Sequence, residues 1–137
     1  WSSDVCSSDL AARAVTSTTS VSGLQVGSVL DGNEVISACR RLGGNGYVVD
    51  DESVFNWQAR LAREEGIFAE PAGAVALAGV AEAVRRGELT PDEPAVCLVT
   101  GSGFKDERSL VRMTGEAPTP LVDDFAAFAK IVRGNLR

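Results

Sequence analysis

The stretch EPAGAVALAGVAEAVRRG, residues 70–87, decides how this 137-residue chain can fold. Its first half is almost entirely alanine and glycine, and Pro71 suits the first position of a helix, where no backbone N–H is needed. Small side chains on every face allow neighbouring backbones to approach closely, so we expect a buried helix. The second half turns polar at Glu82, Arg85 and Arg86, which predicts that this end reaches solvent.

Apolar runs and helical patterns alternate on both sides of this helix. A polar turn at 90–93 leads into AVCLVT, residues 95–100, an apolar run of the kind found in buried parallel strands. Upstream we expect a helix over 34–42 with Asn33 as its cap, a short strand at 47–51 and a helix over 52–65. The predicted fold class is therefore α/β, with an open, mostly parallel sheet and flanking helices.

The two ends of the chain are expected to lie outside this α/β portion. The first ten residues, WSSDVCSSDL, match codon by codon the translation of a common short-read sequencing adapter, so we set residues 1–10 aside and expect Ala11 to be interior to a longer protein. The α/β portion then covers residues 11–113. Residues 114–137 are expected to form a linker, TGEAPTP, and an amphipathic helix whose apolar side carries Leu121, Phe125, Phe128, Ala129 and Val132.

Composition excludes several classes of function. The net charge is −6 and no basic cluster occurs, which argues against a nucleic-acid partner. No apolar run approaches the roughly 20 residues of a membrane span. The chain has no histidine and no paired cysteine spacing, so we predict no metal site and no Ser-His or Cys-His catalysis. Cys39 and Cys97 are expected to be buried reduced thiols, which favours a reducing compartment.

The stretch VTGSGFKD, residues 99–106, follows directly on the apolar run at 95–100. In open α/β sheets ligands gather beyond the carboxyl ends of strands, so this glycine-containing turn could face a ligand. It lacks the third glycine of a dinucleotide fingerprint and the spacing of a phosphate loop, and a simple tight turn fits nearly as well. We expect Lys105 and Asp106 to form a structural ion pair.

Two stretches together resemble a known family. EEGIFAEPAGAVALAGV, residues 64–80, and CLVTGSGFKD, residues 97–106, resemble the C-terminal part of threonine synthases, which are pyridoxal-phosphate (PLP) enzymes of the tryptophan-synthase-β-like group, fold type II. The family pattern is E-G-I-x-x-E-P-[AS]-[GS]-A followed by T-G-x-G-x-K-D, and both occur here in register. STTSVSGLQVG, residues 17–27, is similar to the family's T-I-A-x-[AG] segment. The resemblance covers nearly all of residues 11–113.

The resemblance implies four cofactor-binding residues. Thr100 would donate a hydrogen bond to the pyridine nitrogen of PLP, and a neutral hydroxyl would leave that nitrogen largely unprotonated. Glu70 would lie near the cofactor ring, Gly23 would let the ring lie close, and Gly101 would let the backbone turn away beneath it. From the residues alone, Thr100 suits equally a strand-end hydroxyl bonded to its own turn, and Glu70 suits a helix-start carboxylate.

The resemblance also implies what this chain lacks. Neither of its two lysines, Lys105 and Lys130, matches the position that forms the Schiff base in the family, and no segment matches the phosphate loop. We therefore assign no catalytic residue. We expect the chain to be an inactive C-terminal fragment of a cytoplasmic, homodimeric lyase that converts O-phosphohomoserine and water into threonine and phosphate.

Other readings of the same residues remain open. The parent could be a serine/threonine ammonia-lyase or a cysteate synthase-like enzyme, which would share the cofactor and a small amino-acid substrate. A small non-catalytic α/β ligand-binding module is the alternative from another class, because the chain shows no nucleophile or general base. Against such a module stands the alanine-rich helix, which a free-standing domain this small would struggle to bury.

Overall fold

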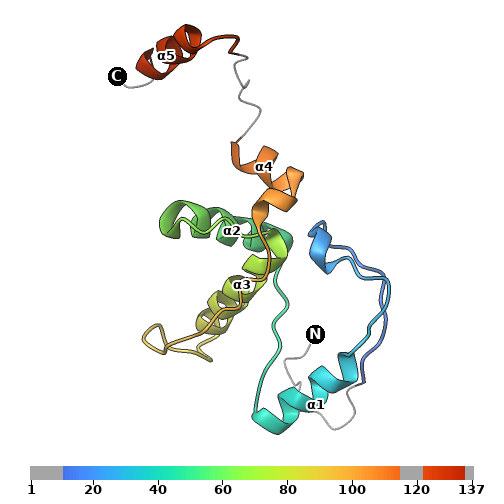
Figure 1. Ribbon diagram of the computed structural model, residues 1–137. Coiled ribbons are helices and arrows are strands. Elements are labelled where there is room, and N and C mark those ends of the chain that lie inside the picture. The colour runs from blue at the N-terminus through green and yellow to red at the C-terminus, as the bar shows by residue number, and fades with distance from the viewer. Residues whose placement is uncertain (1–10, 115–121, 135–137) are drawn as a thin grey trace.

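The structure, a computed structural model, describes residues 11–114 and 122–134, so the predicted adapter decapeptide lies outside the described residues. Within these ranges the chain forms five α-helices and two 3-10 helices: η1 (Ser22–Leu24), α1 (Gly32–Leu42), α2 (Asp51–Glu65), α3 (Pro71–Arg85), η2 (Gly103–Lys105), α4 (Glu107–Thr114) and α5 (Phe125–Gly134). Figure 1 shows α2 and α3 crossing at the centre, with α1 at one end of the molecule and α5 at the other.

The ends of the helices α1, α2 and α3 follow from their sequence. Gly43 and Gly66 end α1 and α2 in the left-handed conformation, with φ of 69° and 70°, which confirms both predicted ends. At the start of α2, Asp50 accepts a hydrogen bond from the backbone N–H of Ser53 at 2.7 Å. The helix α3 begins at Pro71 as predicted, whereas α1 begins earlier than expected, at Gly32.

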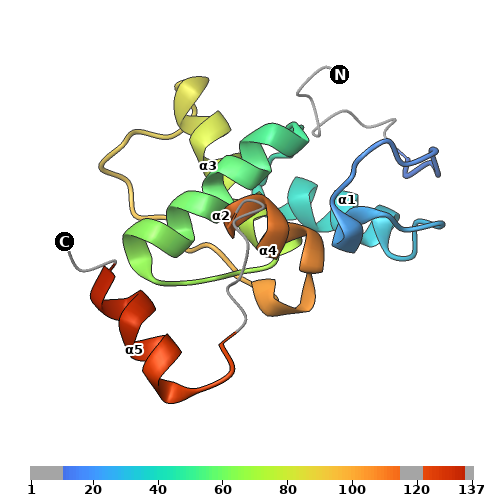
Figure 2. The ribbon, with the colours of Figure 1, turned by 90° about the horizontal axis from the view of Figure 1, so that it is seen from above.

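The core lies where α2 and α3 meet, and the small residues of α3 make it possible. Ala74 and Ala78 of α3 are fully buried against Val54 of α2 and Val21, which precedes η1. Alanine at these positions lets the two helix backbones approach closely. Partly buried hydrophobic side chains pack against this cluster: Val49, Phe55, Trp57, Ala72 and Val75. Figure 2 shows α2 lying across α3, with α4 beside α2.

The predicted α/β fold with an open parallel sheet is wrong for this structure. The described residues contain no strand, and their β-type pairing is limited to one isolated antiparallel bridge between Ala69 and Ser102. Residues 95–100 are extended but not buried, since Val96 and Leu98 are 94% and 76% exposed. The segment 47–50 is likewise extended and unpaired.

The physical reason is that a strand requires a neighbour. An apolar run of six residues fits a strand buried on both faces, but only a second extended segment can satisfy its backbone N–H and C=O groups. In the described part of the chain, residues 47–50 and 95–100 share no backbone hydrogen bond. The composition of these runs therefore predicted two strands that the described part of the chain does not form.

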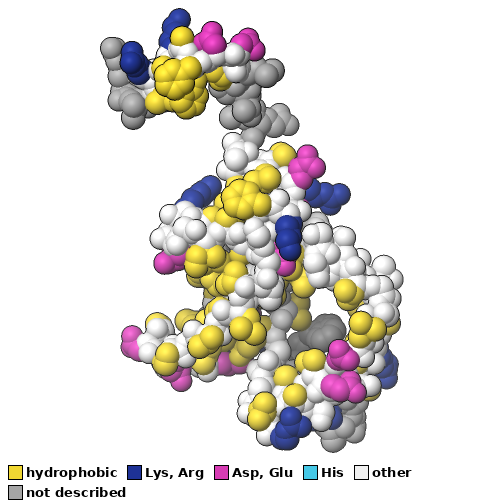
Figure 3. Space-filling view, viewed as in Figure 1, with side chains coloured by type: hydrophobic (Ala, Val, Ile, Leu, Met, Phe, Trp, Pro, Cys, Tyr) yellow, Lys and Arg dark blue, Asp and Glu magenta, His cyan; other side chains and the backbone are white. Residues whose placement is uncertain are grey.

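Two helices lie towards the C-terminal end. The helix α4 follows η2 and Asp106 and was not expected from the sequence. The amphipathic helix is confirmed as α5, and Leu121 lies outside the described residues. Phe125 and Phe128 stand next to each other on α5, with ring centroids 6.2 Å apart, and both are exposed. Figure 3 shows the resulting hydrophobic patch on this helix.

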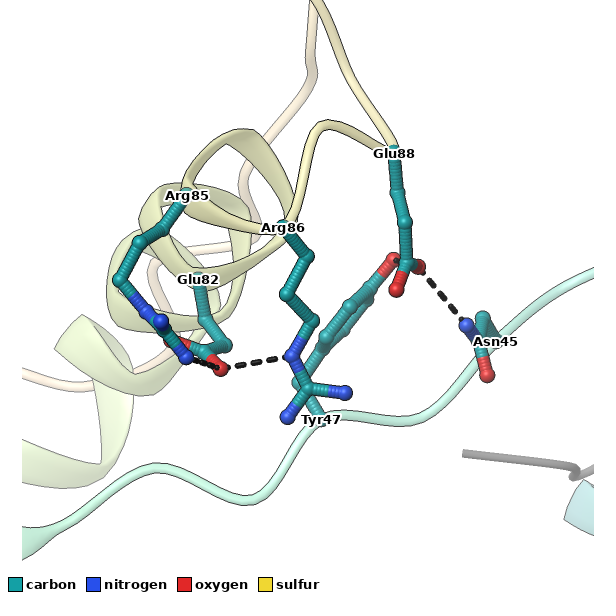
Figure 4. A network of polar contacts seen from close by, with 6 residues as sticks. All are labelled: Asn45, Tyr47, Glu82, Arg85, Arg86 and Glu88. Carbon is teal, nitrogen blue, oxygen red and sulfur yellow. Dashed lines mark hydrogen bonds and ion pairs between the residues drawn. The ribbon is translucent and has the colours of Figure 1, made fainter. Parts of the chain in front are cut away.

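A polar network joins the end of α3 to the segment that follows α1 (Figure 4). Glu88 accepts hydrogen bonds from the Tyr47 hydroxyl at 2.6 Å and from the Asn45 side-chain amide at 2.9 Å. The Tyr47 hydrogen bond lowers the pKa of the Glu88 carboxyl and raises the pKa of the Tyr47 phenol. The network holds residues 45–47 against the last turn of α3 and so limits where α2 can begin.

Two further expectations concern cysteine and membranes. Cys39 and Cys97 are free thiols, as expected, but both are half-buried rather than buried. In the described ranges, no helix is both long enough and apolar enough to cross a membrane.

The packing of α3 predicts opposite effects for two adjacent substitutions. A Cβ atom at Gly79 would meet no atom within 4 Å, so Gly79→Ala should raise the free energy of unfolding by about 0.5–1 kcal/mol through better helix propensity. Ala78 is 1% exposed, and Ala78→Leu should lower the free energy of unfolding by roughly 1–3 kcal/mol through overpacking. Urea unfolding followed by circular dichroism measures both. Effects of the same sign would contradict the packing described here.

Candidate functional site

Two backbone hydrogen bonds bring the start of α3 to the end of the apolar run at 95–100. The Glu70 N–H donates to the carbonyl of Gly101 at 2.9 Å, and the Gly103 N–H donates to the carbonyl of Phe68 at 2.9 Å. These bonds flank the isolated bridge. They place the two motif segments beside each other, although about thirty residues separate them in sequence.

Thr100 and Glu70 form a polar pair at this junction. The Thr100 hydroxyl donates to Oε1 of Glu70 at 3.4 Å, and the hydroxyl is exposed. Glu70 occupies the N-cap position of α3, yet its side chain makes no capping hydrogen bond. Its carboxylate instead fills the space where a side chain at Gly101 would begin. The position of Glu70 at the helix start remains favourable for a carboxylate, although its side chain caps no backbone N–H.

Gly23 reaches the same region from η1. This 3-10 helix packs against α3, and a Cβ atom at Gly23 would lie 2.7 Å from the Cβ of Ala72, closer than side chains approach. One turn of α3 thus touches each predicted site residue. Ala72 meets Gly23, and a Cβ at Gly73 would lie 3.2 Å from the backbone nitrogen of Thr100. The structure therefore brings the four predicted residues together around the first turn of α3.

Asp51, the first residue of α2, holds the η1 segment in place. Its Oδ2 accepts from the backbone N–H and the hydroxyl of Ser20, both at 2.6 Å, and its Oδ1 accepts from the hydroxyl of Thr19. These hydrogen bonds, those of the Ser20 side chain first, lower the pKa of the Asp51 carboxyl. The next residue, Val21, is buried in the core, so Asp51 determines where Gly23 meets α3.

Asp51 was not among the residues predicted from the sequence to form the site. The residue belongs to YVVDD, which was expected to be a strand, and nothing in the local pattern links it to Ser20, 31 positions away. The hydroxyl-rich segment STTS, residues 17–20, is the one available signal, because clustered hydroxyls often bind a carboxylate.

The expected ion pair between Lys105 and Asp106 is not formed. Asp106 instead accepts a hydrogen bond from the Ser109 hydroxyl at 2.6 Å, and its backbone carbonyl accepts from the N–H of Ser109 at the start of α4. Salt bridges among the described residues involve other groups, Arg60 with Glu64 and both Arg85 and Arg86 with Glu82. Asp106 thus serves to begin α4 rather than to pair with a cation.

The chemistry available at this junction is that of a neutral donor beside a carboxylate. An exposed hydroxyl can donate to the edge nitrogen of a flat heteroaromatic ring, and beside it the Glu70 carboxylate occupies the space that a side chain at Gly101 would take. Within the described ranges no three His, Cys, Asp or Glu side chains gather in a way that could hold a metal ion. The arrangement supports ring binding and supplies no nucleophile.

A separate hollow lies beside the segment that follows η1. It has a volume of about 490 Å³ and is lined by residues 14–17 and 25–27. None of the lining side chains is ionisable, so the hollow offers no acid–base chemistry. The first turn of α3 is therefore the candidate site.

Comparison with known proteins supplies an independent finding. The family described as "Pyridoxal-phosphate dependent enzyme" matches residues 2–101. The match includes most of the N-terminal decapeptide, whose origin stays a prediction. All four predicted site residues lie within the match, and Gly101 is its last residue.

The chain is also similar to curated proteins that are named threonine synthase. The threonine synthase of Methanocaldococcus jannaschii is 32% identical over 115 residues, which cover 84% of this chain and 28% of that protein. The threonine synthase of Methanosarcina acetivorans is 32% identical over 119 residues, covering 87% and 29%. That of Halalkalibacterium halodurans is 28% identical over 118 residues, covering 86% and 33%. The chain therefore spans about a third or less of the length of these relatives.

The Asp51 contacts predict a pH-dependent stability. Because the folded pKa of Asp51 is lowered, its stabilisation is complete above its unfolded pKa of about 4 and is lost as the pH falls through the folded pKa. Asp51→Asn should lower the free energy of unfolding at pH 7 by about 1–2 kcal/mol and flatten its decline below pH 4. Urea unfolding between pH 2.5 and 7 measures both effects.

Asp50→Asn provides the matched control for this experiment. It removes the same charge one residue earlier, and asparagine caps helices about as well as aspartate does. If the two variants lose stability equally and keep the same pH dependence, Asp51 does not hold the η1 segment.

Proposed function

Because the chain belongs to the family of pyridoxal-phosphate-dependent enzymes, we propose that it forms part of a threonine-synthase-like lyase. The reaction is the conversion of O-phosphohomoserine and water into threonine and phosphate, so the partner is a small amino-acid substrate. One observation carries the proposal: Thr100, Glu70 and Gly101 meet at the start of α3, in the two segments that match the family pattern. The names of the relatives support the choice of reaction.

The residues at the site fit a pyridoxal ring. Bound PLP supplies an electron sink for reactions at the substrate's carbon atoms. Thr100 would hold the ring by donating its hydroxyl proton to the pyridine nitrogen. Its present contact with Glu70 is long at 3.4 Å, so turning the hydroxyl towards a ring sacrifices little.

The other three residues would shape the surface on which the ring rests. Gly101 has no side chain, so the Glu70 carboxylate can occupy the space beside it and would stand next to the ring edge. Gly23 is held against Ala72, so η1 presents backbone rather than a side chain at the first turn of α3. We assign these roles as cofactor binding, and none of the four transfers a proton in the reaction.

The remaining features of the proposal follow from the resemblance. Lys105 and Lys130 are exposed and lie in η2 and α5, and neither matches the family's Schiff-base position, so we assign neither to the cofactor. The parent enzyme is proposed to be a cytoplasmic homodimer, and free Cys39 and Cys97 suit a reducing compartment. A serine/threonine ammonia-lyase or cysteate synthase-like parent would share the cofactor and differ in substrate, and the TGSGFKD segment favours the threonine-synthase-like alternative.

Titration of this chain with PLP tests the site directly. We expect weak, non-covalent binding that shifts the nuclear magnetic resonance signals of Thr100 and Gly101, without a lysine-linked absorbance band. Thr100→Ala should weaken binding roughly tenfold through loss of one hydrogen bond, whereas Thr100→Ser should retain it. Lys130→Ala is the control, because α5 lies far from the site (Figure 1).

Two results would count against this assignment. If PLP shifts the signals of α5 rather than those of Thr100, the cofactor does not use this site. If Thr100→Ala and Thr100→Ser weaken binding equally, the hydroxyl is not the donor, since the serine variant keeps that group.

The substrate is tested on the longer protein from which the chain is proposed to derive. Amplification of the source DNA upstream of Ala11 yields that reading frame, and the purified enzyme is assayed with O-phosphohomoserine and with serine or threonine. Phosphate release from O-phosphohomoserine is expected. Release of ammonia and a 2-oxo acid from serine or threonine, without phosphate release, would favour the ammonia-lyase instead.

A further inference from the structure

Gln58 is a fully buried polar side chain on the apolar face of α2. Its exposure is 0%, and it lies between Val54 and Leu61, which are also buried on that face. An amide placed in such surroundings is unfavourable unless its polar atoms find hydrogen-bond partners. A leucine at this position would fill the same space without that requirement, so the partners of Gln58 explain its presence.

The side-chain amide of Gln58 donates two hydrogen bonds to two different segments. Its Nε2 lies 2.7 Å from the carbonyl oxygen of Ala69 and 3.0 Å from the hydroxyl oxygen of Ser109. Its Oε1 lies 3.3 Å from the same hydroxyl. One buried group of α2 is therefore bonded both to the residue before Glu70 and to the start of α4.

The hydroxyl of Ser109 has a single proton, and Asp106 determines where it points. The Ser109 hydroxyl lies 2.6 Å from Oδ2 of Asp106, a short contact typical of a donor bonded to a carboxylate. With its proton directed to Asp106, the Ser109 oxygen is left to accept from Gln58. The Gln58 amide thus donates to Ala69 on one side and to Ser109 on the other, and Ser109 donates to Asp106; we call these four linked residues the Gln58 relay.

The Gln58 relay ends on both segments that form the candidate site. Ala69 directly precedes Glu70, and it pairs with Ser102 in the isolated bridge. At the other end, Asp106 follows the TGSGFK segment that begins at Thr100. The relay thus fixes both sides of the bridge to α2, which is itself packed against α3.

We propose that Gln58 is a positioning residue for the cofactor-binding pair Thr100 and Glu70. It acts through Ala69, whose carbonyl it holds, and Ser109 and Asp106 orient it; none of the three touches the ring. This inference rests on the proposed function, since the pair matters only if it binds PLP. The positions of Thr100 and Glu70 then depend on one buried amide in a different helix.

Amide hydrogen exchange tests the positioning without requiring any activity. In this chain, Gln58→Leu removes both donors at nearly constant volume. We expect exchange at the Glu70 and Gly103 amides, whose N–H groups form the two bonds flanking the bridge, to accelerate roughly tenfold more than exchange in the middle of α3. Dividing by the α3 rate removes the part of the change caused by a loss of global stability.

Val54→Ala is the matched control variant. Val54 lies one turn before Gln58 on the same buried face and contributes to the core, but it takes no part in the relay. Its loss should lower global stability while leaving the ratio of Glu70 and Gly103 exchange to α3 exchange unchanged. A ratio in Gln58→Leu that also stays unchanged would overturn the proposal.

Ser109→Ala keeps the experiment decisive if Gln58→Leu does not fold. This variant removes the group that orients Gln58 and leaves the bond to Ala69 possible, so the same ratio should rise by less than in Gln58→Leu. No rise in Ser109→Ala, with Gln58→Leu unfolded, would overturn the relay as the positioning device.

A PLP titration of the same variants separates this inference from the proposed function. If Gln58 positions the pair, Gln58→Leu should reduce the PLP-induced shift of the Thr100 signal more than Val54→Ala does. A changed exchange ratio with no PLP-induced shift in the unsubstituted chain would leave the relay in place and refute the cofactor site. A normal shift in Gln58→Leu, despite a changed ratio, would refute the positioning role alone.

Discussion

The two backbone hydrogen bonds that join Glu70 to Gly101 and Gly103 to Phe68 are the contacts on which the candidate site depends. The segments they connect are far apart in sequence, and neither has other strand partners in the described residues. Without these bonds, Thr100 would lie at the end of an exposed extended run with nothing to fix its distance from α3. A single pair of strand residues is weak by itself. It persists because buried groups on both sides hold it, so the stability of the site is tertiary rather than local.

Close packing explains the motif glycines better than turn geometry does. The glycines with positive φ among the described residues, such as Gly66, end helices, whereas the glycines of the TGSG segment do not have positive φ. At Gly103 a side chain would meet the ring of Phe68, which packs edge-to-face on Phe104 with centroids 5.0 Å apart. At Gly101 it would displace the Glu70 carboxylate. The sequence motif therefore encodes where two segments touch, and the cofactor role of Gly101 stays a prediction.

The sequence predicted local structure well and pairing badly. Pro71 and Gly66 placed helix ends because capping depends on residues within one turn. The apolar run at 95–100 was expected to be a buried strand, yet Val96 is almost fully exposed. The hydrophobicity of a segment indicates that it can be buried, but it does not identify the segment that would cover it. The four candidate site residues, in contrast, were predicted from the family pattern, and the structure places them around the first turn of α3. Their role in cofactor binding stays a prediction.

The polar groups that support the site could not be found in the same way. Asp51 and Gln58 bind partners 31 and 51 residues away, Ser20 and Ser109, and local periodicity carries no information over that range. Gln58 interrupted an apolar face, which signals a buried polar contact without naming the partner. The supporting groups also differ from the candidate site residues in burial and in hydrogen-bond length. The Gln58 amide is buried with a 2.7 Å bond to Ala69, whereas the Thr100 hydroxyl is exposed with a 3.4 Å contact. This difference suits a binding site. The buried Gln58 bond would keep the backbone in place, while the exposed Thr100 hydroxyl would be free to exchange Glu70 for a ligand.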